Sequence, residues 1–444
     1  MSSLIITNAT LVNEGSITQS DVLIRNGRIE KIAPHISAEA EKVIDAKGRY
    51  LLPGMIDSHL HFREPGITQK GTIASESRAA VMGGITSFME MPNTKPVAIT
   101  RSILEDKFEI ARQTSYANYS FYMGASNENL DEVRAVDPSN VCGVKVFMGS
   151  STGNMLVDKA EILESIFKAA PLLIATHCED TPMILENEAK AKAQFGEAVP
   201  YNQHGIIRSR EACYKSSALA VSLAKRHDAP LHILHITTKE ELDLFEAGHP
   251  RITGEACVHH LWFTDADYDR LGALIKCNPA IKTQADRDAI RAAVVDNRIT
   301  TIGTDHAPHL WEEKQQTYFK SPGGLPLVQF AMPALLEMVH QGVFTLEQVV
   351  HKVAHAVADR YQMIDRGYIR EGYWADLILV DMNQITEDVP EKVAYKCGWS
   401  PFNGTRFRGT ICTTIVNGEV VYQDGETVHK KPAGQRLLFS AHRR

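Results

Sequence analysis

Short apolar segments recur along the middle of the chain and alternate with segments of helical periodicity. Eight of the apolar segments have the length and composition of buried strands. They are residues 54–60, 85–91, 118–124, 143–148, 172–177, 231–236, 252–258 and 300–305. Helical patterns separate most of them, for example at 104–113, 159–168, 208–226, 240–247 and 284–296. The alternation predicts an α/β fold, a parallel (β/α)₈ (TIM) barrel over residues 54–365.

A doubly wound open sheet would give a similar alternation of strands and helices. Such sheets usually carry a glycine-rich phosphate loop after a strand. The chain has neither a Gly-x-Gly-x-x-Gly motif in that place nor a Walker loop. The barrel is therefore the favoured architecture.

Both ends of the chain have a different pattern, in which short β-prone segments alternate with turn residues. Asn26-Gly27, Asn417-Gly418 and Asp424-Gly425 are typical hairpin turns. Neither end has enough strands to enclose a core alone. We therefore expect residues 1–53 and 366–444 to form one small, β-sandwich-like domain, with the barrel inserted between them.

Composition and charge change this picture little. Hydrophobic residues make up 44% of the chain and charged residues 23%, and the net charge is -7. These values suggest a soluble protein and give no reason to expect a nucleic-acid or membrane partner. The first residues do not resemble a signal peptide, so we expect a cytoplasmic location. The seven cysteines include no Cys-x-x-Cys pair, so we expect free thiols.

Side chains able to bind a metal stand at the carboxyl ends of the predicted strands, where a barrel places its active site. Side chains alternate along a strand, so His59 and His61 should lie on one face and could bind one cation. The full set is His59 and His61 after the first strand, Lys145 in the fourth, His177 and His235 after the fifth and sixth, and Asp305 after the eighth.

Lys145 needs a separate explanation, because an ammonium group has no lone pair and would repel a cation. A neutral, buried lysine amine can react with carbon dioxide to form a carbamate, which offers two anionic oxygens. A carbamylated Lys145 could bridge two divalent cations. We expect His59, His61 and Asp305 to hold one cation, and His177 and His235 to hold the other. Zinc suits this set, as do cobalt and manganese.

Taken one at a time, these residues have ordinary explanations. A single buried histidine such as His177 or His235 is more often a hydrogen-bonded core residue than a ligand. The same structural interpretation is preferred here for His232, His259 and His260. The complete set at successive strand ends favours a metal centre.

Four motifs add a resemblance to a known family. They are Arg63-Glu-Pro-Gly66, Met91-Pro-Asn-Thr94, Cys277-Asn-Pro-Ala280 and Asp305-His-Ala-Pro-His309. With His59-Leu-His61 and the segment 367–381, they make the whole chain resemble the amidohydrolase superfamily and, within it, the dihydroorotases. That family interconverts N-carbamoyl-L-aspartate and L-dihydroorotate in pyrimidine biosynthesis.

The resemblance also implies roles for individual residues. Asp305 would be the catalytic residue that transfers a proton, and two zinc ions would be bridged by carbamylated Lys145. Arg63 and Asn93 would bind the substrate carboxylate, since a guanidinium forms a forked pair with it. A homodimer is implied as well. The substrate pocket would be completed by Asn278, His309, Pro322 and Gly323.

One departure from the family pattern keeps alternatives open. Many dihydroorotases of this layout place a bridging aspartate in a loop after the fourth strand, and residues 149–154 contain none. Another cyclic amidohydrolase, such as a dihydropyrimidinase, hydantoinase or allantoinase, therefore remains an alternative. A non-catalytic scaffold with the same fold is a second one.

Overall fold

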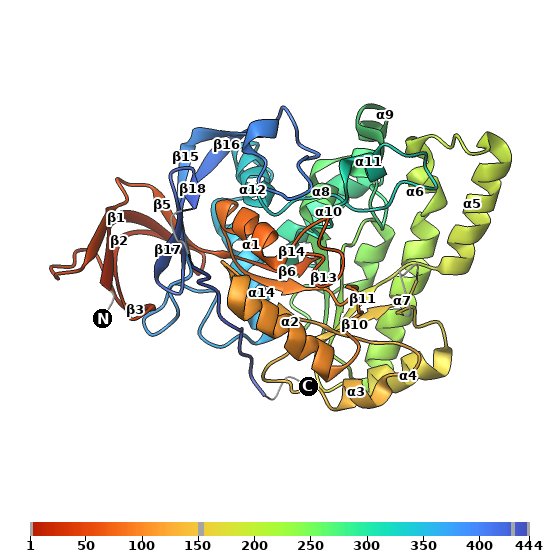
Figure 1. The fold of residues 1–444 in the computed structure, drawn as a ribbon, viewed down its shortest axis with the longest axis horizontal. Coiled ribbons are helices and arrows are strands. Elements are labelled where there is room, and N and C mark those ends of the chain that lie inside the picture. The colour runs from red at the N-terminus through yellow and green to blue at the C-terminus, as the bar shows by residue number, and fades with distance from the viewer. Residues whose placement is uncertain (1–2, 150–154, 428–430, 442–444) are drawn as a thin grey trace.

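The computed structural model describes residues 3–149, 155–427 and 431–441 of the chain, and its centre is a group of strands surrounded by helices (Figure 1). All eight predicted barrel strands are present, the third as two short pieces. They are β6 (Met55–Leu60), β7 (Ile85–Glu90), β8 (Asn118–Phe121) with β9 (Met123–Gly124), β10 (Val144–Phe147), β11 (Ile174–His177), β12 (Leu231–Ile233), β13 (Ile252–Cys257) and β14 (Thr301–Gly303).

Parallel pairing runs in order through these strands, from β6 to β8 and from β9 to β14. The chain itself joins β8 to β9. Backbone hydrogen bonds just beyond β14 close the ring: His61 N donates to His306 O at 2.7 Å, and Asp305 N donates to His59 O at 2.7 Å. The predicted TIM barrel is confirmed, and its closure lies at the proposed metal ligands.

Helices surround the barrel, and several begin at side-chain caps. Ser209 caps α7, and Thr283 forms a capping box at α10. The helices are α1 (Ile73–Met82), α2 (Arg101–Thr114), α3 (Leu130–Arg134), α4 (Ala160–Ala169), α5 (Thr181–Phe195), α6 (His204–Ile207), α7 (Arg210–His227), α8 (Val258–Trp262), α9 (Tyr268–Leu271), α10 (Gln284–Val295), α11 (Trp311–Lys314), α12 (Ala331–His340), α13 (Leu346–Val350) and α14 (Ala356–Tyr361).

The predicted helix over residues 240–247 is wrong. The structure has a 3₁₀-helix there, η2 (Glu240–Leu244), which ends when Phe245 adopts an extended backbone and buries its ring. Gly248 then has a φ of 73°, which glycine adopts without strain. Burial of Phe245 therefore overrides the helical periodicity. Across the described residues, no helix is long and apolar enough to span a membrane.

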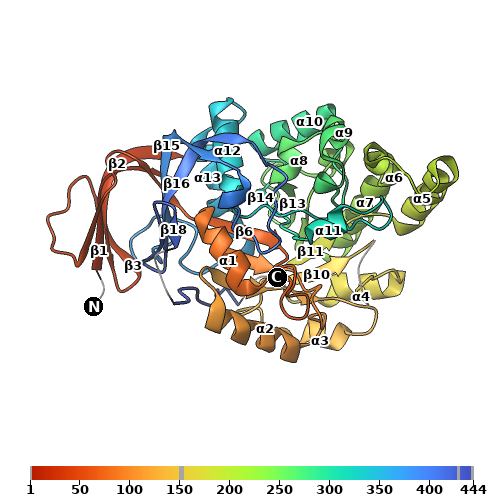
Figure 2. The same cartoon turned by 45° about the horizontal axis from the view of Figure 1, so that its top comes forward.

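Strands from both ends of the chain form one nine-stranded sheet, ordered β18-β17-β16-β15-β5-β1-β2-β3 with β4 beside β1. Figure 1 and Figure 2 place this sheet at one end of the molecule, with α5 at the other. The terminal strands therefore do combine, while the domain limits at 53/54 and 365/366 stay a prediction. The strands are β1 (Ser3–Asn13), β2 (Ser16–Arg25), β3 (Arg28–Ala33), β4 (Lys42–Asp45), β5 (Tyr50–Pro53), β15 (Leu377–Glu387), β16 (Arg406–Val416), β17 (Glu419–Gln423) and β18 (Glu426–Thr427).

A buried ion pair supports the strand beside the first metal-ligand segment. Lys107 on α2 and Glu90 at the end of β7 are both fully buried, with Nζ 3.0 Å from Oε2. Glu90 Oε1 accepts a hydrogen bond from Phe62 N at 2.9 Å. The pair therefore fixes the backbone immediately before Arg63.

We predict that Lys107→Met lowers the free energy of unfolding by about 3–5 kcal/mol, because it leaves the buried Glu90 carboxylate unpaired. Urea denaturation followed by circular dichroism measures the change. Lys190→Met is the matched control, since Lys190 pairs with Glu186 at 2.7 Å but is 67% exposed. Equal effects of the two substitutions would contradict the role given to the buried pair.

Candidate metal centre and active site

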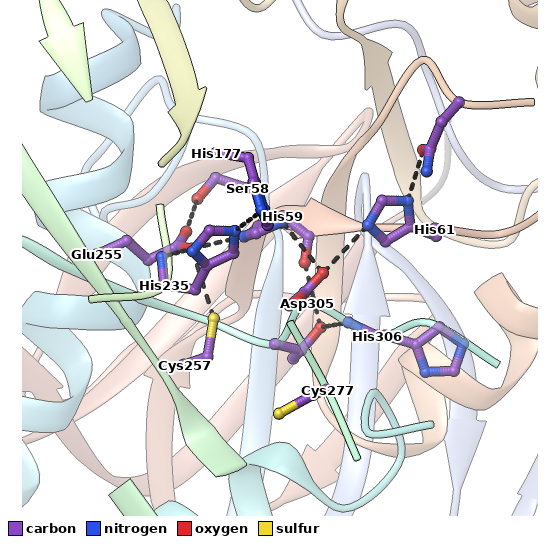
Figure 3. A network of polar contacts seen from close by, with 12 residues as sticks. Ser58, His59, His61, His177, His235, Glu255, Cys257, Cys277, Asp305 and His306 are labelled. Atoms are coloured by element: carbon purple, nitrogen blue, oxygen red, sulfur yellow. Dashed lines mark hydrogen bonds and ion pairs between the residues drawn. The ribbon is translucent and has the colours of Figure 1, made fainter. Parts of the chain in front are cut away.

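Two histidines and one aspartate meet where the first and last barrel strands close. The Nε2 atoms of His59 and His61 each lie 3.1 Å from Asp305 Oδ1 (Figure 3). All three residues are almost completely buried, and their ligand atoms lie within 4.8 Å of one another. The predicted grouping of these residues is present in the structure.

The other ring nitrogen of each histidine is held by a neighbouring acceptor. His59 Nδ1 donates to Glu255 Oε1 at 2.7 Å, and His61 Nδ1 donates to Asn93 Oδ1 at 2.7 Å. These bonds direct both Nε2 atoms toward Asp305, and metal-binding histidines typically have such an acceptor on the other ring nitrogen. Although burial opposes it, the carboxylates of Asp305 and Glu255 raise the pKa of His59 to about 9.

A second pair of histidines lies beside the first. His177 Nδ1 is 3.0 Å from His235 Nε2, and the ring of His235 is 5.2 Å from that of His59 between centroids. His177 Nε2 donates to Glu179 Oε2 at 2.9 Å, and Arg208 pairs with the same carboxylate oxygen. Burial lowers the pKa of both His177 and His235, so both are neutral and able to donate a lone pair.

Lys145 points into the same region of the barrel. It lies in β10, next to the strand that carries His177, and only 1% of it is exposed. Burial lowers its pKa to about 8, although Asp305 and Glu255 oppose this shift. The charge of Lys145 in turn contributes to the lowered pKa of His177 and His235. All six predicted metal ligands therefore share one electrostatic environment.

Three of the site residues have a left-handed backbone that non-glycine residues rarely adopt. The φ angles are 71° at Arg63, 42° at His235 and 49° at Asp305. Strain of this kind concentrates at functional sites, where the surrounding structure maintains it. Gly66 completes the turn after Arg63, because a Cβ there would lie 1.9 Å from Lys95 O.

Arg63 is buried beside the candidate metal ligands and contacts only neutral groups. Its Nε donates to Pro308 O at 3.1 Å, and one terminal nitrogen lies 3.1 Å from His309 Nε2. Among the residues that the structure describes, no carboxylate comes within the 4.0 Å ion-pair distance of this guanidinium. Burial lowers the pKa of Arg63 to about 10, so it stays charged at neutral pH.

The remaining predicted substrate residues line the same end of the barrel. His309 Nε2 lies 3.1 Å from Gly323 O, and a Cβ on Gly323 would be 2.8 Å from Asn278 Nδ2. Within the described chain, the buried Oδ1 of Asn278 has no hydrogen-bond partner. Pro322, next to Gly323, directs its carbonyl to Lys314 Nζ at 2.9 Å. Asn278 therefore offers an unused acceptor for a substrate N–H.

Sequence reasoning missed Glu255 and Glu179, which orient His59 and His177. A glutamate within the predicted strand 252–258 was the available signal for Glu255, which the structure shows to be fully buried. Asn93 was predicted to bind substrate, and the structure shows that it also orients His61. Residues 150–154, which belong to the segment without an aspartate after the fourth strand, lie outside the described residues.

The donor set fits divalent cations well. Four imidazoles and one carboxylate direct ligand atoms toward a common region, and three of the imidazoles are oriented by acceptors on their other nitrogen. Such outer partners are typical of zinc and related metal sites. The residues could therefore hold one or two cations.

The chain belongs to the amidohydrolase family, whose model matches residues 50–421. It is similar to a dihydroorotase of Halobacterium salinarum, with 33% identity over 420 residues that cover 92% of this chain and 96% of the relative. A dihydroorotase of Pyrococcus abyssi is 31% identical over 426 residues, covering 96% of both chains.

Solved structures of cyclic amidohydrolases have the same fold. An L-hydantoinase (dihydropyrimidinase) from Arthrobacter aurescens superposes with a TM-score of 0.94 and 25% identity, covering 99% of this chain and 100% of its own. A dihydropyrimidinase from Brevibacillus agri gives 0.89 at 25% identity and 99% coverage of both chains. The chain is therefore a hydrolase of cyclic amides, in a family that is generally metal-dependent.

We predict that Glu255→Gln weakens metal binding by about 10–100-fold, because the neutral amide no longer enhances the basicity of His59. Metal content after dialysis against a graded series of chelator concentrations measures the loss. Glu186→Gln on the exposed face of α5 is the control. Unchanged metal retention by the Glu255 variant would show that this carboxylate does not support a ligand.

Proposed function

We propose that the protein is a dihydroorotase, which reversibly cyclises N-carbamoyl-L-aspartate to L-dihydroorotate in the third step of pyrimidine biosynthesis. The observation that best supports this proposal is the buried guanidinium of Arg63, which has no carboxylate partner in the described chain. A buried, unpaired charge is costly unless a ligand neutralises it. The carboxylate of dihydroorotate supplies that charge.

The substrate ring would lie between the metal ligands and the loop that carries Gly323. Arg63 would hold the carboxylate with charge-assisted hydrogen bonds, helped by the Nδ2 group of Asn93. Asn93 is suited to this role because His61 uses only its Oδ1 atom. The free Oδ1 of Asn278 would accept a ring N–H.

Metal ions would be held by His59, His61, Asp305, His177 and His235, with carbamylated Lys145 between them. When bound, two divalent cations such as zinc would polarise the amide carbonyl and lower the pKa of water. Asp305 would then transfer a proton between water and the ring nitrogen. Although burial opposes it, His59 and His61 keep the pKa of Asp305 well below its ordinary value, so it is ionised and able to accept a proton.

A dihydropyrimidinase or hydantoinase is the second candidate, because the superposed structures carry those names. The neutral rings of such substrates give Arg63 no charge to pair with. A non-catalytic scaffold is disfavoured, since the potential ligands are all present and oriented. A cytoplasmic location and a homodimer remain part of the proposal.

The direct test compares substrates on protein of measured metal content. We expect turnover of L-dihydroorotate and N-carbamoyl-L-aspartate to exceed that of dihydrouracil, hydantoin and allantoin. Efficient opening of dihydrouracil or allantoin without activity on dihydroorotate would contradict the proposal. No activity on any of them after reconstitution with metal and bicarbonate would favour the scaffold.

Arg63→Met should lower kcat/KM for dihydroorotate by about 100-fold or more, since loss of one partner of a buried charge pair costs ~2–5 kcal/mol. The loss should be mainly in KM, and any residual activity on dihydrouracil should not fall. Arg360→Met is the matched control, because burial also lowers the pKa of Arg360 to about 10 and its guanidinium bonds backbone carbonyls of Leu231 and Arg251. Equal losses in both variants would count against carboxylate binding by Arg63.

A further inference from the structure

We propose that Lys276 and Lys314 are positioning residues that hold the substrate loop, residues 315–325, in its binding conformation. This inference rests on the proposed function, because Pro322 and Gly323 are taken to contact the substrate ring. The proposed role concerns binding of the substrate ring and does not involve the candidate metal ligands. The evidence is a set of hydrogen bonds from two buried ammonium groups to backbone carbonyls of this loop.

Lys314, at the end of α11, uses its ammonium group entirely on backbone carbonyls. Its Nζ donates to Pro322 O at 2.9 Å, to Gly324 O at 2.8 Å and to Lys276 O at 3.3 Å. The three acceptors match the three hydrogens of an ammonium group. Only 1% of the residue is exposed, so water does not replace these bonds.

Lys276 extends the same arrangement from the other side of the loop. Its Nζ donates to Tyr318 O and to Ser321 O, both at 2.6 Å. Its own carbonyl accepts from Gly324 N at 2.8 Å as well as from Lys314. The two lysines thus bind four carbonyls of the loop and link them to the segment that carries Asn278.

Neither lysine forms an ion pair with a carboxylate in the described part of the chain. Burial lowers the pKa of Lys314 to about 7 and that of Lys276 to about 8, which shows how unfavourable the charges are in this place. A methionine would fill similar space at lower cost if only packing were needed. Carbonyl binding, together with the Tyr318 ring whose centroid lies 4.3 Å from Lys276 Nζ, is what distinguishes lysine here.

The carbonyls that Lys314 binds flank a residue that is expected to contact the substrate. Gly323 lies between Pro322 and Gly324, the two loop residues that Lys314 binds. Gly323 O also lies 3.1 Å from His309 Nε2. A shift of Pro322 and Gly324 would therefore move the backbone of Gly323 away from Asn278 and His309. The expected consequence is weaker substrate binding with intact chemistry.

The test uses Lys314→Met and Lys276→Met in the metal-loaded, full-length protein. We expect KM to rise about tenfold or more while kcat changes little. A rise of this size corresponds to the loss of at least one buried hydrogen bond in the binding site. Metal content should equal that of the wild type. The substrate is the one that the wild type turns over best among the cyclic amides, so a wrong proposed function does not obscure the result.

Lys352→Met is the matched control. Lys352 is 2% exposed, its Nζ donates to Ile299 O at 2.6 Å and to Asn297 Oδ1 at 2.9 Å, and burial lowers its pKa to about 8. The substitution removes a comparable buried ammonium from a place outside the substrate loop. We expect it to lower stability in urea as much as the loop substitutions do and to leave KM unchanged.

Two outcomes would overturn the inference: an unchanged KM in folded, metal-loaded Lys314→Met and Lys276→Met, or an equal rise in KM in Lys352→Met. If Lys314→Met does not fold, Lys314→Gln is used in its place and Lys352→Gln becomes its control. Glutamine keeps two N–H donors, so it is a milder change than methionine. A rise in KM for Lys314→Gln alone then supports the role in positioning, and equal KM values overturn it.

Discussion

Closure of the barrel between its first and last strands is the constraint on which the site depends. The two hydrogen bonds that join His61 to His306 and Asp305 to His59 bring ligands from opposite ends of the barrel sequence within 3.1 Å of each other. Without this closure, Asp305 could not face both histidines. Asp305 itself has a left-handed backbone, a conformation that persists only where the surrounding structure maintains it.

The candidate ligands could be predicted from the sequence because strand ends are recognisable from the local pattern. His59, His61, His177 and Asp305 follow apolar segments directly, and parallel strands in a barrel direct such residues to one end. Glu255 and Glu179 could not be found in this way, because their partners depend on contacts between elements that are far apart in the sequence. The same holds for Lys276 and Lys314, which bind backbone carbonyls of a loop. The prediction of a helix over 240–247 is wrong for a related reason, because burial of Phe245 against the rest of the fold ends the helical segment.

Different parts of the molecule determine the fold and the choice of substrate. The barrel with its added β sheet is an architecture that this chain shares with a hydantoinase and a dihydropyrimidinase. Selection of a carboxylate would depend on Arg63, Asn93 and the loops around His309 and Gly323. These groups lie beside the candidate metal ligands, and buried lysines bond the carbonyls of the loop that carries Gly323. Changes there could alter the substrate while the candidate metal ligands stay the same.

The central claim is that one buried site combines a metal centre with a carboxylate-binding arginine. A crystal structure of the metal-loaded protein with L-dihydroorotate bound tests it most directly. The account predicts metal ions between His59, His61, Asp305, His177 and His235, and the substrate carboxylate within hydrogen-bond distance of Arg63. A substrate carboxylate bound away from Arg63, or metal ions held by other residues, would contradict it.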